Sequence, residues 1–232
     1  MKEPKEPTNE WRLSSDYDEE IHLNGGYTLA LGYCYLNRLE YLFKQNNRRL
    51  FQFRTKWGWC GVNFLFSAMR PDNILIINSW ANSAMVAKSH TTLFYVWSAI
   101  LRNILEVRGP DNKPIPTMII DMPAAIHRHL NLEDSTIDKT KFLQNREKYK
   151  AKIIDPIISD NPSHIRYIDL LDYFSAEWEM IIENQKNEHN RSPWHISDQV
   201  LDTIFSHFLQ FTNNAEHYSH MNLIKDLKQL KL

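Results

Sequence analysis

The stretch Asn73-Ile-Leu-Ile-Ile-Asn78 decides the fold of this chain. It is a short, continuous apolar run, rich in β-branched residues and bounded by polar ones, which is typical of a strand buried on both faces of a sheet. A strand with two buried faces needs a layer of structure on each side. The run therefore predicts the middle layer of a three-layer domain.

Other segments extend this pattern along the chain. Pro116–Asp121 and Ile165–Asp169 are further strands of the buried type, and Arg48–Arg54 alternates weakly between apolar and polar residues. Apolar residues recur at helical spacings of three and four in the segments Tyr27–Phe43, Leu93–Leu105, Leu170–Ile182 and Val200–Leu209. Strands that alternate with helices predict an α/β fold with a mainly parallel sheet.

The two ends of the chain and one internal segment are more polar. Residues 1–20 carry prolines and mixed charge, which predicts a mobile polar tail, and 21–232 then form a single α/β domain. The charged segment Arg128–Lys152 is expected to mix loop with a solvated helix. Asn222–Leu232 is a short amphipathic piece that we expect to pack on the domain.

The charge balance argues against binding to polyanions. The chain holds 27 Lys and Arg against 28 Asp and Glu, a net charge of −1, so no bulk electrostatic attraction draws it to nucleic acid or an anionic membrane. The tract Lys44–Trp57 interleaves basic and aromatic residues, as grooves for single-stranded nucleic acid do. A strand at the sheet edge with its basic side chains in water is favoured over that function.

The composition also limits which metal ions and cofactors the chain could bind. Cys34 and Cys60 are the only cysteines, which excludes a disulfide framework and a cysteine-based zinc site but leaves a single bridge open. His217 and His220 have a spacing that could share a metal ion, but no third ligand is evident. The six glycines form no phosphate-binding motif. We therefore predict no metal and no cofactor, and the lack of a signal-peptide core or membrane span in the chain as given predicts a cytoplasmic protein.

Ligand sites of parallel sheets lie beyond the carboxyl ends of the strands, which selects two groups of candidate residues. Asn78 and Ser79 follow the deciding strand and could hold an oxyanion, although a simple capped turn is the alternative. His195 precedes the Val200–Leu209 helix and could act as a general base, or it could be a surface histidine. Ser197 or Asp198 suits the N-cap of that helix.

Three motifs follow one another along the chain, and their order and spacing are informative. They are Pro71–Trp80 with its strand and polar turn, Met118-Ile-Ile-Asp-Met-Pro123, and Ser192-Pro-Trp-His195 ahead of a helix. Together they resemble the SGNH (GDSL-type) hydrolases, especially the PC-esterase branch, over about residues 60–211. The resemblance implies a flavodoxin-like fold and hydrolysis of an O-acyl ester on a small or glycan-like substrate. It also implies that His195 is the base that deprotonates a serine and that Asn78 is an oxyanion donor.

The chain departs from this family in two places. The aspartate that the family has three residues before the histidine is Ser192 here, and Pro193 replaces a small residue. No Gly-Asp-Ser block follows a strand before residue 48, since Ser14-Ser15-Asp16 has neither the strand nor the glycine. We therefore expect the first strand to be missing and the hydrolase to be incomplete or inactive. The alternative is a pseudoenzyme, a non-catalytic binding or scaffold domain with the SGNH fold.

Overall fold

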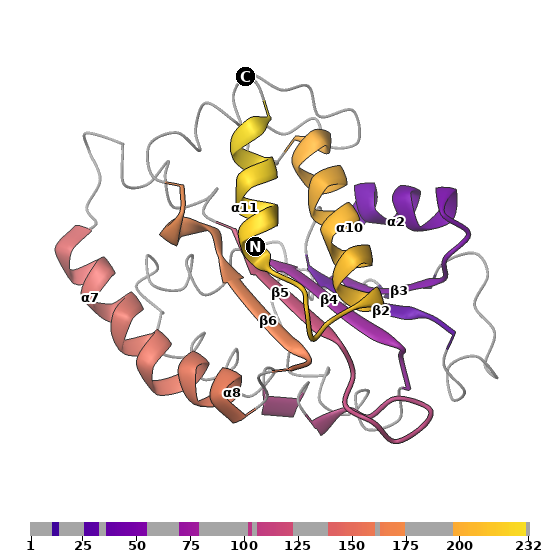
Figure 1. The fold of residues 1–232 in the computed structure, drawn as a ribbon, viewed down its shortest axis with the longest axis horizontal. Coiled ribbons are helices and arrows are strands. Elements are labelled where there is room, and N and C mark those ends of the chain that lie inside the picture. The colour runs from indigo at the N-terminus through magenta and orange to yellow at the C-terminus, as the bar shows by residue number, and fades with distance from the viewer. Residues whose placement is uncertain are drawn as a thin grey trace, which may run out of the picture.

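A computed structural model describes residues 11–13, 26–32, 36–54, 70–78, 102–103, 106–122, 139–160, 163–174 and 197–230 of the chain. These residues form a sheet with helices on it (Figure 1). The strands are β1 Trp11–Leu13, β2 Thr28–Gly32, β3 Leu50–Arg54, β4 Asn73–Asn78, β5 Thr117–Asp121 and β6 Ile165–Asp169.

The sheet has the order β1-β3-β2-β4-β5-β6. The strands β2 to β6 are all parallel, and only the short β1 runs antiparallel, beside β3. The predicted three-layer α/β fold with a mainly parallel sheet is confirmed. The strands predicted at Arg48–Arg54, Asn73–Asn78, Pro116–Asp121 and Ile165–Asp169 are β3 to β6.

The prediction that the first strand is missing was wrong. Thr28–Gly32 forms β2, which lies between β3 and β4, and every residue of it is buried. The helix expected over Tyr27–Phe43 is only α2, Leu36–Gln45. A strand buried on both faces shows no alternation, so Leu29 could be counted into the apolar stripe of the helix that follows.

Two smaller expectations change at the β1 side of the sheet. Trp11–Leu13 lies within the segment predicted to be a mobile tail, yet its backbone pairs with Phe51–Phe53 of β3. The strand β3 is accordingly not at the edge of the sheet but one place inside it, next to β1.

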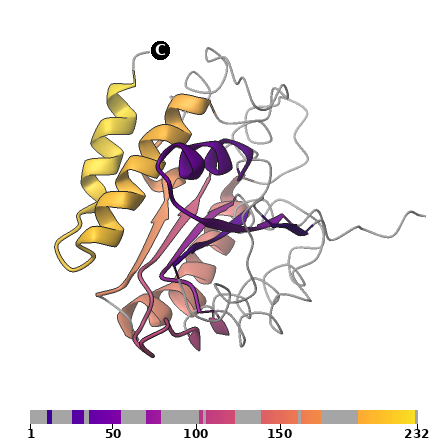
Figure 2. The same ribbon diagram turned by 90° about the vertical axis from the view of Figure 1, so that its right-hand side faces the viewer.

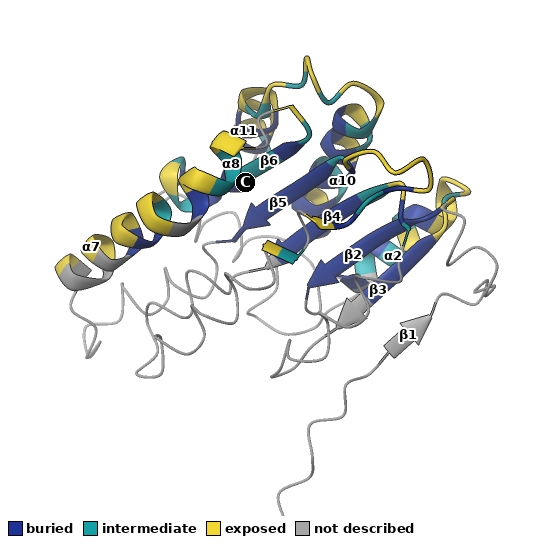
Figure 3. Cartoon of the chain, turned by 90° about the horizontal axis from the view of Figure 1, so that it is seen from below, coloured by how far each residue is buried: buried dark blue, intermediate teal, exposed yellow. Residues whose placement is uncertain are grey.

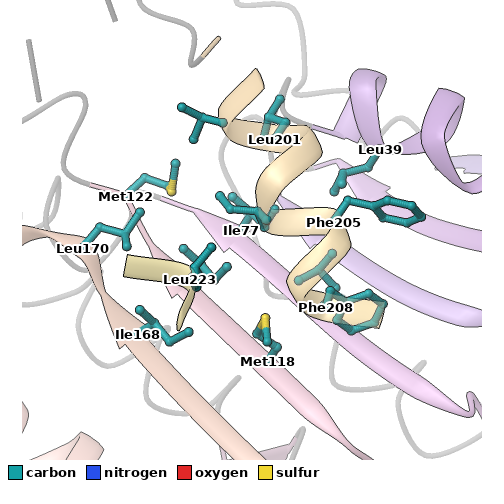
Figure 4. Close-up of a cluster of buried hydrophobic side chains, with 14 of the residues drawn as sticks. Leu39, Ile77, Met118, Met122, Ile168, Leu170, Leu201, Phe205, Phe208 and Leu223 are labelled. Atoms are coloured by element: carbon teal, nitrogen blue, oxygen red, sulfur yellow. The ribbon is translucent and has the colours of Figure 1, made fainter. Parts of the chain in front are cut away.

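One face of the sheet packs against α2, α10 (Asp198–Asn213) and α11 (His220–Gln229). Figure 2 shows α10 and α11 together on one side of the strands, and Figure 4 shows the side chains that meet there. The core joins alternate strand residues, such as Ile77 and Ile120, to Phe43, Phe205 and Phe208. This confirms the Val200–Leu209 helix and the docking of the C-terminal amphipathic segment on the domain.

The segment after β5 supplies the helix α7 (Lys139–Tyr149), a π-helical turn (Lys150–Ile154) and α8 (Asp155–Asp160). Figure 3 shows α7 with an exposed outer surface and the strands β2, β4 and β5 buried. The helical part of the Arg128–Lys152 prediction is thus correct, but its inner face is buried at Arg146 and Tyr149.

Two predicted helices fall mainly outside the described residues. Most of Leu93–Leu105 lies there, as does the greater part of Leu170–Ile182. The described start of the second segment is a 3-10 turn, Leu170–Asp172, whose N-cap is Asp169.

Gly32 fixes the closest approach between β2 and β4. A Cβ atom at this position would lie 2.5 Å from the carbonyl oxygen of Ile77, closer than van der Waals contact permits. The two strands are hydrogen-bonded neighbours, with Gly32 opposite Ile77. Any side chain at residue 32 would therefore force these strands apart at their carboxyl ends.

Replacing Gly32 by Ala is expected to destabilise the domain by about 1–3 kcal/mol, because backbone must move to admit the methyl group. Urea unfolding followed by circular dichroism measures this. Gly109→Ala is the matched control, since the nearest atom to its Cβ would be Oδ1 of Asp111, at 3.3 Å, which can turn away, and the next neighbours lie at ordinary contact distances of 3.7 and 3.8 Å. Equal unfolding midpoints for the two variants would contradict the proposed strain.

Candidate functional site at the carboxyl edge

Polar residues end three neighbouring strands at the carboxyl edge of the sheet. Asn78 ends β4, Asp121 ends β5 and Asp169 ends β6, and the register pairs Asn78 with Asp121 and Asp121 with Asp169. Adjacent strands lie about 4.8 Å apart, so these residues form one continuous row. The strands β4 and β5 are apolar runs that each stop at a polar residue, and the mixed strand β6 also ends at an aspartate.

The crevice of such a sheet lies where successive connections leave in opposite directions. From β2 the chain passes through α2 to β3 on one side, and it later returns to β4 on the other side of β2. The carboxyl ends of β2 and β4, at Gly32 and Asn78, therefore flank this point. It is the position where a parallel sheet of this type binds its ligand.

The helices α2 and α10 begin beside the same edge and are tied to each other. Arg38, in the first turn of α2, donates from Nε and Nη2 to the two carboxylate oxygens of Asp202 at 2.7 and 2.6 Å. Its Nη1 also lies 3.7 Å from Oδ2 of Asp198, the first residue of α10. Ser197 is the N-cap of α10, as the sequence suggested, and its Oγ accepts from the Val200 amide. The bridge holds two helix N-termini together.

A cluster of charged side chains lies on the other face of β5 and β6, and we call it the carboxyl-edge cluster. Its members come from both strands, from α7 with the turn that follows it, and from the 3-10 turn: Asp121, Arg146, Tyr149, Lys150, Tyr167, Asp169 and Asp172. Strand alternation places Asp121 and Asp169 opposite Ile120 and Ile168, which face the α10 side.

Buried ion pairs compensate most of the charge in this cluster. Arg146, 4 % exposed, donates from Nε and Nη2 to one oxygen of Asp169 at 3.1 and 2.6 Å, and its Nη2 also reaches Asp172 at 2.5 Å. Lys150 forms a hydrogen bond with the second oxygen of Asp172. The remaining oxygen of Asp169 accepts from the Leu171 amide at 2.9 Å. Both carboxylates are thus held by cations on one helical surface.

Asp121 lies outside these ion pairs. Its carboxyl group is 1 % exposed, and Oδ2 accepts from the Tyr167 hydroxyl at 3.0 Å. Burial raises the pKa of Asp121 well above the ordinary 3.8, and the charge of Asp169 raises that pKa further. The hydrogen bond from Tyr167 and the charges of Arg146 and Lys150 offset only part of this rise. The group therefore favours its protonated form.

The phenols beside Asp121 are also shifted. Burial raises the pKa of Tyr167 and of Tyr149 well above the ordinary 10, and the nearby Asp121 and Asp169 raise both further. Neutral phenols can donate and accept hydrogen bonds, so Tyr167 is able to fix the orientation of the Asp121 carboxyl.

The sequence-predicted site residues stand as follows. Asn78 is the last residue of β4 and sits beside Asp121 in the register, but its side chain lies outside what the structure describes. Ser79 and His195 are also outside the described residues. His195 precedes the Ser197 N-cap by two residues, so the chain ties it to the N-terminus of α10.

Sequence reasoning missed the carboxyl-edge cluster. Asp121 and Asp169 were recognised only as the polar ends of strands, and Arg146 and Lys150 were assigned to a solvated helix. The available signal was the spacing of Arg146 and Lys150, since residues four apart share one face of a helix.

The described residues contain no group of three or more His, Cys, Asp or Glu side chains placed to hold a metal ion. His220, considered as a metal ligand above, has its Nε2 3.0 Å from the Tyr173 hydroxyl instead. Within the described part of the chain, no helix has the length and apolar character needed to cross a membrane. No protein-family model matches this chain, and no curated protein does.

Arg146→Ala should destabilise the fold by about 3–5 kcal/mol, because it leaves the buried Asp169 carboxylate without its main counter-charge. Chemical unfolding at neutral pH gives this value. Lys113→Ala provides the comparison, since Lys113 pairs with Asp111 in an exposed ion pair that solvent screens, and its loss should change stability far less. Similar losses of unfolding free energy in the two variants would show that the ion pair of Arg146 contributes no more to stability than an exposed pair does.

Asp121→Asn should make the protein more stable than the wild type at pH 7, with a margin that vanishes near pH 4. Above the ordinary pKa of 3.8 and below the raised folded pKa, the folded wild type binds one more proton than the unfolded chain. Its stability therefore falls by about 1.4 kcal/mol for each pH unit in that interval, and the amide does not titrate. Thermal melts from pH 4 to pH 7 measure the difference. If the stability difference between Asp121→Asn and the wild type shrinks as the pH rises, the pKa of Asp121 is not raised in the folded protein.

Proposed function

We propose that this chain is an SGNH-type hydrolase of the PC-esterase kind, which hydrolyses O-acyl esters of a small or glycan-like substrate. Its active site lies at the carboxyl edge between β2 and β4. The observation that carries the proposal is the sheet order, in which β2 lies between β3 and β4 and its chain leaves at the crevice. This is the strand order of a flavodoxin-like sheet, which the three motifs had led us to expect.

The presence of β2 supplies a place for the nucleophile. The last residue of β2 and the two residues after it are Gly32-Tyr33-Cys34, where the resembled family has Gly-Asp-Ser at the end of its first strand. Consecutive Cα atoms are about 3.8 Å apart, so Cys34 stays within about 8 Å of Gly32. Cys34 is therefore our proposed nucleophile, in place of a serine.

The bridge from Arg38 to Asp198 and Asp202 supports pairing Cys34 with His195. Cys34 precedes Arg38 by four residues, and His195 precedes Asp198 by three, so both are tethered to the same corner of the domain. A thiolate is stabilised near a helix N-terminus, and α2 begins two residues after Cys34. The alignment of two helix N-termini therefore favours thiolate chemistry at this corner.

The reaction then follows ordinary acyl transfer. His195 accepts the thiol proton, and the sulfur of Cys34 bonds to the acyl carbon while Asn78 and Ser79 stabilise the oxyanion. The alcohol leaves with the proton from His195. Water next cleaves the thioester, with His195 again accepting a proton, and releases the carboxylic acid. A thiol is more acidic than a hydroxyl, so the loss of the family's aspartate at Ser192 is less costly for cysteine than for serine.

A binding or scaffold domain is the second candidate. The observation that favours it is the same triplet, because Tyr33 and Cys34 replace the family's acidic residue and serine while Ser192 replaces its aspartate. A domain of this kind would hold a glycan or ester at the carboxyl edge without turning it over.

Turnover of p-nitrophenyl acetate tests the hydrolase. We expect more than one product per protein molecule, and a fall of about 10²–10⁴-fold in kcat/KM for both Cys34→Ala and His195→Ala. The matched control is Cys60→Ala, which removes the other cysteine and should retain activity. Iodoacetamide should label Cys34 faster than Cys60.

A burst of a single equivalent, or equal activity in Cys34→Ala and Cys60→Ala, would argue against the hydrolase. Binding of a glycan that persists in His195→Ala, with no turnover in the wild type, would favour the scaffold domain.

A further inference from the structure

Asp121 is the one acid of the carboxyl-edge cluster that the described cations do not contact. Asp169 and Asp172 take up the hydrogen bonds of Arg146 and Lys150. Asp121 Oδ2 is occupied by Tyr167, whereas Oδ1 is buried and has no hydrogen-bond partner in the described part of the chain. A buried polar atom without a hydrogen-bond partner costs stability. Such an atom therefore calls for an explanation, and a ligand that completes its hydrogen bonding is one.

We propose that Asp121 is a neutral hydrogen-bond donor that binds an acceptor oxygen of the ester, either its carbonyl oxygen or the oxyanion that forms from it. This inference rests on the proposed esterase and assigns a further binding group to the same edge. Its ligand class is an uncharged acyl group with a carbonyl acceptor.

The register places Asp121 where such a donor is useful. It lies opposite Asn78, on the strand next to the proposed oxyanion residue, about 4.8 Å away across the sheet. The helix N-termini of α2 and α10 approach the edge from the Ile77 face, and Asp121 approaches it from the opposite face. The acyl group would then be held from both sides of the sheet.

The charges around Asp121 favour the neutral form. From β6 it faces Tyr167 and the anionic Asp169; from α7 it faces Tyr149 and Arg146; and Lys150 acts on it from the π-helical turn. Both cations lie nearer to Asp169 and Asp172, which they contact directly. Burial and the negative charge of Asp169 both raise the pKa of Asp121 well above its ordinary value, which favours the protonated carboxyl over the carboxylate.

A protonated carboxyl group has an infrared C=O band that a carboxylate lacks, which gives a readout separate from activity. The difference spectrum between wild type and Asp121→Asn at pH 7 should show this band. Addition of p-nitroacetanilide, the amide counterpart of p-nitrophenyl acetate, should shift it, because the bound carbonyl accepts the Asp121 proton in a hydrogen bond. The surface variant Asp111→Asn should leave the band in place, since the Asp111 carboxylate is exposed.

Kinetics provide the second arm. Asp121→Ala should lower kcat/KM by about 10²-fold, as removal of one oxyanion donor does. Asp121→Asn should lose less, since its amide still donates, and should no longer show an alkaline decline caused by ionisation of residue 121. Tyr167→Phe should move that decline to higher pH, because the Tyr167 hydrogen bond lowers the pKa of Asp121.

The outcomes separate this inference from the proposed function. A band that shifts with p-nitroacetanilide in a protein without turnover would refute the esterase and support the donor subsite. Full turnover in Asp121→Ala would support the esterase and refute the donor subsite. The absence of the band from wild type at pH 7, or a band that ligand leaves unchanged, would overturn the assignment of Asp121.

Discussion

The close approach of β2 to β4 at Gly32 is the constraint on which the carboxyl edge depends. Because residue 32 has no side chain, the two strands stay paired through Gly32 and Ile77, and Ile77 and Asn78 keep their register with Ile120 and Asp121. The polar strand ends then fall into one row. The same contact lets the chain turn directly from β2 into α2, whose first turn carries the Arg38 bridge to α10.

The two sides of this edge use charge differently. On the α10 side, Arg38 joins two helices through Asp202 and Asp198 and leaves their N-termini close together. On the α7 side, Arg146 donates its hydrogen bonds to Asp169 and Asp172 and makes none to Asp121, whose pKa is raised by burial and by the charge of Asp169. The carboxyl-edge cluster thus contains one more aspartate than cations, and this excess suits the α7 side to an uncharged hydrogen-bond acceptor.

Strands β4 and β5 were predictable from sequence because each is a continuous apolar run closed by a polar residue, and β6 because its two isoleucines flank a short segment of β-forming residues. β2 was not, because Leu29 lies just ahead of the true helical stripe of Leu36, Leu39 and Phe43 and falls on the same helical spacing. The location of the site at the carboxyl edge follows from a parallel sheet, and Asn78 was correctly placed at the end of a strand. The charged cluster was beyond reach because Arg146 pairs with a residue 23 positions away, and only the fold shows which side of its helix is inside.

The π-helical turn Lys150–Ile154 sets the length of the segment between Arg146 and β6. A regular α-helix advances about 100° per residue, so deleting one residue here would rotate α8 by that amount relative to α7. Arg146 would still hold α7 to Asp169, and α8 would turn a different surface toward β6. Among homologues this segment should therefore vary in residue type far more readily than in length, and an alignment gap inside Lys150–Ile154 would mark a protein in which α8 packs differently against β6.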